Sequence, residues 1–290
     1  MVDDLEICNI DIQSYLLLKD GVKPVVRVGL GRSRVDGAKE VAKKLGLEVI
    51  VKEFKHLYGG ELPETKINAY YSLDKNLCRK ALDAENGGDR KKFGLILGYP
   101  ECCIDSFIKN LSLGVDYFLI SNRNTTAKPS FFCNNLFVFD SKISGEQESN
   151  IFQKNASIFD SMNIKRSFLI RHVPCSFDCN DSIEIGKKTL RLLKRHSPDL
   201  AGKIVDALKK PVLYWNYFEW IVLNGSAERR VLVYDSILGF ESLIGNDIKK
   251  MVLSGNKVKI MDDNLSIFRG SEKIGDIPVK NGLPLCIDFQ

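Results

Sequence analysis

Two short segments, each with a proline directly ahead of its cysteines, constrain this chain more than any other feature. They are Gly98–Cys103, which reads GYPECC, and His172–Cys179, which reads HVPCSFDC. Apolar residues recur at helical spacing after each segment, which predicts that a helix follows each proline. Proline suits the first position of a helix because its φ is already near helical and its missing N–H would be unpaired there anyway. Both sets of cysteines are therefore expected in the first turns of helices.

A helix start changes the chemistry of a thiol. The free backbone N–H groups and the helix dipole stabilise the thiolate, which is the form that binds a metal ion. Cys175 and Cys179 are four residues apart, so we expect them on one face of the second helix, directed toward its apolar side. On the first helix we expect Cys103 on the apolar face and Cys102 on the polar face.

The spacing of these cysteines leaves the identity of the site open. Cys175 and Cys179 match the first half of the radical-SAM motif, but Ser182 stands where its third cysteine would be, which disfavours that cluster. Two short-spaced cysteine pairs are typical of structural zinc sites. We therefore favour an iron–sulfur cluster or zinc bound by Cys102, Cys103, Cys175 and Cys179 over a reactive-thiol site and over inert buried thiols.

The remaining four of the eight cysteines divide into one candidate and three core thiols. Cys133 follows a polar loop and is a plausible additional metal ligand. Cys8, Cys78 and Cys286 have no cysteine nearby and are expected to pack as small apolar side chains. In a reducing compartment, this number of cysteines is more typical of buried thiols and metal ligands than of disulfides.

Two residues beside the second segment are candidates for catalysis. If the protein is an enzyme, Arg171 would hold an anionic substrate, and His172 would exchange protons near neutral pH. The residues themselves indicate no particular reaction, so we leave open whether the chain is an enzyme at all.

At these two segments the chain resembles an uncharacterised, mainly archaeal family, domain-of-unknown-function family 483. The resemblance lies in Gly-Tyr-Pro-x-Cys-Cys, here Gly98–Cys103, followed by His-x-Pro-Cys-Ser-x-x-Cys, here His172–Cys179. It covers the middle of the chain. It implies that the two proline–cysteine segments form one site, and it implies no activity.

The predicted secondary structure divides the chain into three parts. We expect them either as separate domains or as one continuous domain. Residues 1–60 predict a strand–helix–strand unit, residues 61–210 a mainly helical core that bears the cysteines, and residues 211–290 a β-rich part. The expected fold class is therefore α/β, with α+β as the alternative.

Individual elements follow from periodicity and turn signals. In the first part, β-rich runs at 14–18 and 23–28 flank Asp20-Gly21, which is typical of a short hairpin turn, and a helix at 35–45 and a strand at 47–54 follow. In the second part we expect helices at 73–84, from Pro100 onward, at 146–161, at 174–196 and near 199–209, with a polar loop at 121–130. In the third part, hairpins are expected over 212–234, turning at Asn224-Gly225, and over 257–269.

The net charge of +5 is local. Residues 183–210 contain eight basic and three acidic residues, so this segment alone accounts for the surplus. A contact for RNA or an anionic small molecule would use Lys187, Lys188, Arg191 and Arg195. The solvated face of an amphipathic helix is the favoured interpretation. A binding module with this basic surface, and with a structural zinc or simply packed cysteines, is the alternative to the metal-binding function.

Composition and the sequence near both ends favour a protein that does not span a membrane. With 44% hydrophobic and 27% charged residues, the chain has a globular profile, and no apolar run approaches the ~20 residues of a spanning helix. The acidic N-terminus lacks the basic-then-apolar order of a signal peptide. We expect a cytoplasmic protein without membrane contact.

Overall fold

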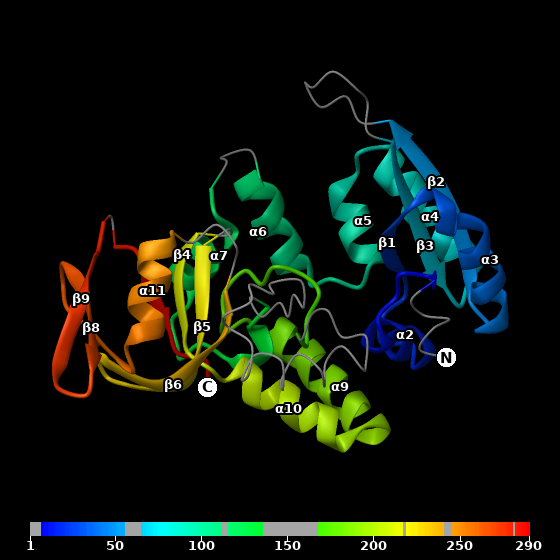
Figure 1. Ribbon diagram of the computed structural model, residues 1–290. Coiled ribbons are helices and arrows are strands. Elements are labelled where there is room, and N and C mark those ends of the chain that lie inside the picture. The colour runs from blue at the N-terminus through cyan, green and yellow to red at the C-terminus, as the bar shows by residue number, and fades with distance from the viewer. Residues whose placement is uncertain are drawn as a thin grey trace.

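Two antiparallel sheets lie at opposite ends of the structure, with helices between them (Figure 1). This is a computed structural model, and it describes residues 7–55, 65–111, 115–135, 168–216, 219–240, 245–280 and 282–290. The expected mixed α/β class is confirmed. Because every ladder between described strands is antiparallel, the fold takes the α+β form of that class.

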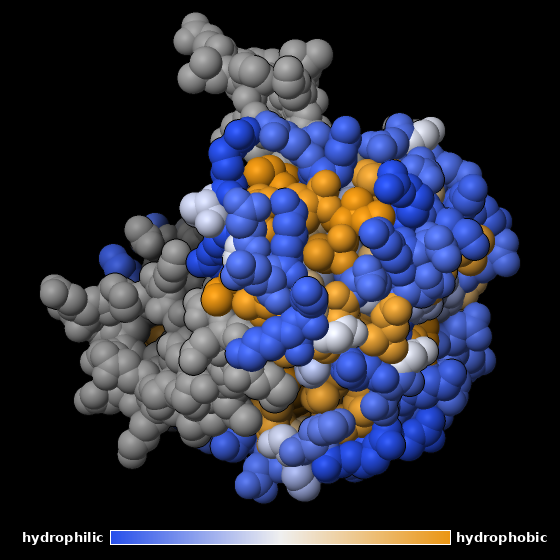
Figure 2. Space-filling model, turned by 90° about the vertical axis from the view of Figure 1, so that its right-hand side faces the viewer, coloured by the Kyte–Doolittle hydropathy of each residue, from blue (hydrophilic) through white to orange (hydrophobic). Residues whose placement is uncertain are grey.

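The smaller sheet has the strand order β1-β3-β2 and is formed by β1 (Val26–Leu30), β3 (Thr65–Ser72) and β2 (Glu48–Lys55). Alternate residues of β3 point to opposite faces, so Tyr71 joins a core under α3 (Val35–Lys44) and Tyr70 joins a core under α4 (Lys75–Asn86). The expected helix at 35–45 and strand at 47–54 are confirmed. The end of the molecule that carries α3 shows hydrophobic patches within a largely hydrophilic surface (Figure 2).

The hairpin expected around Asp20-Gly21 is wrong. Residues 14–18 lie in a helix, α2 (Ile12–Lys19), whose N-cap is Asp11. The Asp11 carboxylate accepts a hydrogen bond from the backbone N–H of Ser14 at 2.8 Å, which starts the helix. A short apolar run fits a strand and a buried helix equally well, and here the neighbours decide, because Leu17 packs into one core and Leu18 into another.

Four helices make up most of the described middle of the chain. They are α5 (Arg90–Ile96), α6 (Glu101–Leu111), α9 (Asn180–His196) and α10 (Pro198–Leu208), and a further helix, α7 (Tyr117–Asn124), precedes the turn Phe131–Cys133. The helices expected at 73–84, after Pro100 and near 199–209 are confirmed. The polar loop expected at 121–130 is helical up to Asn124, and the helix expected from 174 begins only at Asn180. The helix expected at 146–161 lies outside the described residues.

The larger sheet has the order β10-β4-β5-β6-β7-β8-β9. Its strands are β4 (Val212–Asn216), β5 (Glu219–Glu228), β6 (Val231–Phe240), β7 (Lys257–Ile260), β8 (Asn264–Arg269), β9 (Glu272–Pro278) and β10 (Leu285–Ile287), with α11 (Asn246–Ser254) between β6 and β7. The expected hairpin over 257–269 is confirmed as β7 and β8.

The other expected hairpin turns at a different place. Asn224-Gly225 lies inside β5, at a shift in its register with β6, and the chain turns instead at Arg229, which has a φ of 54°. A Cβ on Gly225 would lie 2.0 Å from the carbonyl oxygen of Val233. Gly225 therefore permits a close approach of β5 and β6. A glycine within a β pattern can indicate such an approach as well as a turn.

Candidate metal centre

The four cysteines of the two proline-led segments meet in space. Their sulfur atoms all lie within 4.8 Å of one another. Cys179 Sγ lies 3.7 Å from both Cys102 Sγ and Cys103 Sγ, and those two sulfurs are 3.9 Å apart. Cys103 and Cys179 are buried, Cys175 is half-buried and Cys102 is exposed, so the group lies just below the surface.

The first segment folds as expected. The carbonyl of Pro100 accepts hydrogen bonds from the backbone N–H groups of Cys103 and Ile104, at 3.1 and 3.0 Å, so α6 begins directly after the proline. Cys102 and Cys103 are thereby held in its first turn, with Cys103 directed inward and Cys102 outward. Adjacent residues on a helix diverge by about 100°, yet the sulfurs of this pair both reach the same group.

The second segment folds differently from the expectation. Cys175 belongs to a loop and Cys179 is the N-cap of α9, so the two do not share a helical face. The carboxylate of Asp178 accepts hydrogen bonds from the backbone N–H groups of Thr126 and Ala127, at 3.0 and 2.9 Å. Phe177 is fully buried, and its N–H donates to the hydroxyl of Thr125 at 2.9 Å. These contacts with the chain after α7 use groups that an earlier helix start would need, so the helix begins late.

The four cysteines differ in the pKa of their thiols, because of hydrogen bonding and burial. Hydrogen bonds from Cys103 and from Ser182 lower the pKa of Cys179 to about 4, against the effect of its own burial. Burial, followed by the charge of Cys179, raises the pKa of Cys102 to about 12. The pKa of Cys103 is raised by its hydrogen bond to Cys179 and by burial, and the pKa of Cys175 by burial first. Near neutral pH the group therefore holds one thiolate, at the start of α9, and three thiols.

Ser182 is the residue that sequence reasoning missed. Its side chain is fully buried, and its Oγ lies 3.3 Å from Cys103 Sγ and 2.8 Å from His172 Nε2. The sequence drew attention to this position only as the absence of a third cysteine. Its distance of three residues from the N-cap, Cys179, is the one signal that places it beside the site.

The other candidate residues lie around this group without joining it. The thiol of Cys133 is buried and directed at the carbonyl oxygen of Cys179, at 4.0 Å. Burial, and then the charge of Lys23, lower the pKa of His172 to about 3, so its ring is neutral near pH 7. Arg171 Nη2 lies 2.5 Å from Asp11 Oδ2. Away from the site, Cys8 and Cys78 are buried as expected and Cys286 is half-buried in β10.

The basic segment forms one face of α9 and the helix that follows. Lys187 and Arg195 make exposed ion pairs, with Glu184 at 2.8 Å and with Asp20 at 2.5 Å. The opposite face of α9 is buried at Ser182, Gly186, Thr189, Leu190, Leu192 and Leu193. This arrangement is that of an amphipathic helix with a solvated face. Nucleic-acid binding by this face stays a prediction.

Comparison with known proteins supports the family resemblance. A family model described as a protein of unknown function (DUF483) matches residues 65–198. These matched residues are called the DUF483 region below. The DUF483 region begins at β3, contains all four clustered cysteines, and ends at the start of α10. No curated protein and no solved structure matches the chain. Within the described residues, no helix is long and apolar enough to cross a membrane.

Proposed function

We propose that the protein binds one zinc ion through Cys102, Cys103, Cys175 and Cys179. The observation that carries this proposal is the mutual closeness of the four sulfurs, which lie within 4.8 Å of one another. A tetrahedral zinc ion with Zn–S bonds of about 2.3 Å has sulfurs about 3.8 Å apart. The three separations among Cys102, Cys103 and Cys179, at 3.7, 3.7 and 3.9 Å, fit that geometry.

The same separations favour a single ion over an iron–sulfur cluster. In a four-iron cluster each cysteine binds a different iron, so the ligand sulfurs are spread around the cluster rather than around one ion. Four sulfurs this close leave no room for a cluster between them. Of the two cofactors that the sequence left open, the spacing supports zinc.

The surroundings of the sulfurs also suit metal-bound thiolates. The backbone N–H of Cys175 donates to Cys103 Sγ at 3.3 Å, and the hydroxyl of Ser182 lies at the same distance from that sulfur. Hydrogen bonds of this kind fix the orientation of a ligand and compensate the negative charge of a thiolate. Cys133 packs against the backbone of Cys179 and is not needed to complete the four ligands.

The role that follows for the zinc is structural. Four cysteine ligands fill a tetrahedral site and leave no open position for a substrate. The ion would join the start of α6 to the loop before α9, segments that are more than 70 residues apart in the chain (Cys103 and Cys179 are 76 residues apart). It would thereby stabilise the folded DUF483 region.

Metal analysis of the purified protein tests this function. Anaerobic purification is expected to give a colourless protein with one zinc ion per chain. Cys103→Ser and Cys179→Ser are expected to lose the zinc, whereas the control Cys286→Ser, at a half-buried thiol outside the group, keeps it. A brown protein that contains iron and sulfide, or full zinc content in both cysteine variants, would contradict the proposal.

Proton release gives an independent test of the four ligands. Because Cys179 is already a thiolate near neutral pH and the other three cysteines have raised pKa values, zinc binding is expected to release three protons, one each from Cys102, Cys103 and Cys175. Calorimetric titration of the zinc-free protein in buffers of different ionisation enthalpy measures this number. Release of one proton or none would show that the thiols do not all bind the ion.

A further inference from the structure

A small cavity lies beside the cysteine group, across the hydrogen bond between His172 and Ser182. It has a volume of about 20 Å³ and is lined by Lys23, Tyr99, Arg171, His172, Leu97 and Leu169, among others. By the same measure, one water molecule needs roughly 10–15 Å³. The cavity therefore accommodates one or two small polar atoms, with apolar side chains around them.

The charges at this cavity do not balance. Lys23 is half-buried, and its Nζ lies 5.1 Å above the ring of Tyr99, without an ion pair within the part of the chain that the structure describes. Arg171 approaches Asp11, the N-cap of α2, but among the described residues its buried Nε has no hydrogen-bond partner. Two cations thus face one carboxylate, and that carboxylate also accepts hydrogen bonds from Ser14.

The other titratable groups near the cavity do not remove this surplus. The ring of His172 is neutral, because burial lowers its pKa to about 3. Burial raises the pKa of Tyr99, so its phenol is neutral as well. Arg27, whose charge also reaches Tyr99, is paired with Glu85 at 2.8 Å. While Lys23 is protonated, the net charge at the cavity is therefore that of a single cation.

We propose that this cavity binds the carboxylate group of a small organic acid, with Lys23 and Arg171 as the groups that recognise it. The planar guanidinium of arginine matches the two oxygens of a carboxylate, and the ammonium of lysine adds a point charge. A surplus of one positive charge is neutralised by a monoanion, whereas a phosphate dianion would leave a buried negative charge. The two oxygens of the carboxylate would fill the cavity, and the hydrocarbon chain of the acid would extend from it past Leu97 and Leu169.

This site does not depend on the proposed zinc. Its two cationic residues lie outside the cysteine group, and hydrogen bonds from Cys103 through Ser182 to His172 connect that group to the cavity wall. Anion binding and zinc content can therefore be measured on the same samples, and either can fail without the other.

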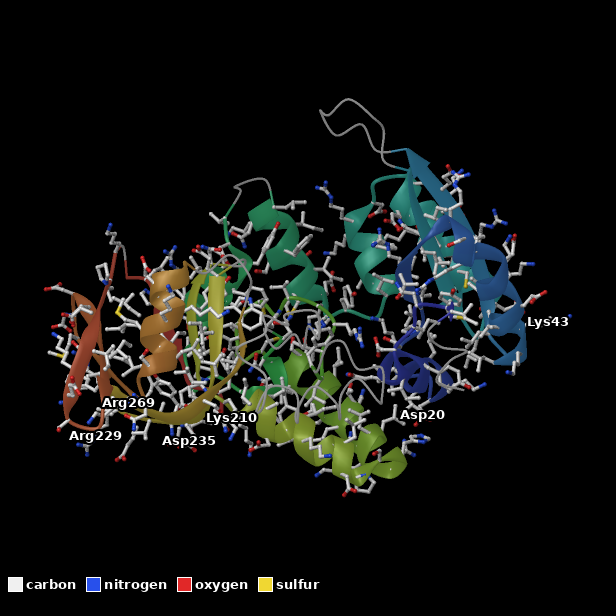
Figure 3. All side chains as sticks on the ribbon, in the orientation of Figure 1. Asp20, Lys43, Lys210, Arg229, Asp235 and Arg269 are labelled. Carbon is white, nitrogen blue, oxygen red and sulfur yellow. The ribbon has the colours of Figure 1, made fainter. Side chains whose placement is uncertain are left out.

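The test is a calorimetric titration of the purified protein with butyrate, inorganic phosphate and butylamine. Butyrate is expected to bind, phosphate more weakly and butylamine not at all. Lys23→Met is expected to weaken butyrate binding about tenfold or more, since it removes a charged hydrogen-bond donor. Lys23→Arg, which keeps the charge, is expected to stay within about threefold of the original affinity. The control is Lys43→Met on α3, which makes the same charge change on an exposed, outward-pointing side chain (Figure 3).

Several results would overturn the proposal. They are absence of butyrate binding by the unmodified protein, equal affinity in Lys23→Met, or an equal loss in Lys43→Met. Tighter binding of phosphate than of butyrate would show that the cavity takes a phosphate group instead. If thermal unfolding shows that Lys23→Met is not folded, Arg171→Lys is tested in its place. This variant is expected to weaken butyrate binding while the zinc content stays unchanged.

Discussion

The cysteine group and the cavity beside it both include side chains from residues 168–182. Nevertheless, the two sites suit ligands of opposite charge. The cysteine group contains one thiolate and three thiols whose sulfurs lie close enough together to hold a metal ion, so it suits a cation. The cavity contains Lys23 and Arg171 against one carboxylate, so it suits an anion. His172 and Ser182, both neutral and buried, lie between the two.

The comparison shows two ways of building a site. The sulfurs of the cysteine group come from two compact motifs. A proline and a helix start hold Cys102 and Cys103, whereas a loop holds Cys175 and the N-cap position of α9 holds Cys179. The cationic groups of the cavity come from unrelated places, because Lys23 follows α2 and Arg171 precedes the second motif. A site built from local motifs can be recognised in the sequence, whereas a site assembled from distant parts of the chain cannot.

Removal of the proposed zinc ion should have the largest effect and should distinguish the cysteine group from the cavity. A ligand that binds only the folded protein stabilises it by about 4 kcal/mol when its free concentration is about 1,000 times its Kd. A strong zinc chelator is therefore expected to lower the free energy of unfolding by several kcal/mol, as measured by urea denaturation. Hydrogen exchange should show the loss of protection at the starts of α6 and α9, while β5 and β6 remain protected.

Equal stability with and without chelator, in protein shown to contain no metal after chelation, would contradict a structural metal. The control is Cys286→Ser, which keeps all four clustered cysteines and should respond to the chelator as the unmodified protein does.

Loss of the Ser182 hydroxyl should have an intermediate effect on both sites. Ser182→Ala leaves Nε2 of the buried His172 without its partner, which is expected to cost about 1–3 kcal/mol of unfolding free energy. The zinc content is expected to stay at one ion per chain because Ser182 is not a ligand. Urea denaturation and metal analysis check both expectations, with the exposed Ser33→Ala as the control. Loss of the zinc would mean that the hydroxyl is essential to the metal centre.

The affinity of the cavity for butyrate should depend on pH. Burial, and then the charge of Arg171, lower the pKa of Lys23 to about 7, while Asp11 acts in the opposite direction. Below that pH Lys23 is charged and attracts an anion, and above it the charge is lost. Butyrate binding is therefore expected to weaken by about tenfold per pH unit once Lys23 deprotonates, as measured by titration from pH 6 to pH 9. Lys23→Arg should give a flat profile, and the same pH dependence in that variant would assign the titration to another group.

The smallest effect is expected on the basic face of α9. Arg195 pairs with Asp20, which lies at the end of α2 nearest α9 (Figure 3), and the arginine side chain is 69% exposed. Exposed ion pairs contribute about 0–1 kcal/mol and weaken as salt is added. Arg195→Ala is accordingly expected to change the unfolding free energy by less than about 1 kcal/mol. A larger loss would show that this pair helps to hold α2 against the DUF483 region.

Much of the cysteine group could be predicted from sequence because its elements are local. Pro100 and the apolar periodicity after it fix the start of α6, and with it the positions of Cys102 and Cys103. The loop position of Cys175 could not be predicted, because Asp178 and Phe177 are held by Thr125, Thr126 and Ala127, which are about 50 residues earlier in the chain. The strand that the sequence predicts at 14–18 is wrong for a similar reason, since only the packing of these residues against two separate cores distinguishes a helix there.

By itself, the sequence determined the mixed class of secondary structure, the similarity of residues 65–198 to the DUF483 family, and which cysteines lie together. These depend on periodicity, on proline geometry and on motif spacing, all of which act over a few residues. The tertiary structure alone decided the pairing of β1 with β3, the late start of α9, the role of Ser182, and the meeting of Lys23 with Arg171 at a cavity. These depend on contacts between residues far apart in the chain, whose partners are chosen by burial and charge only when the whole fold is assembled.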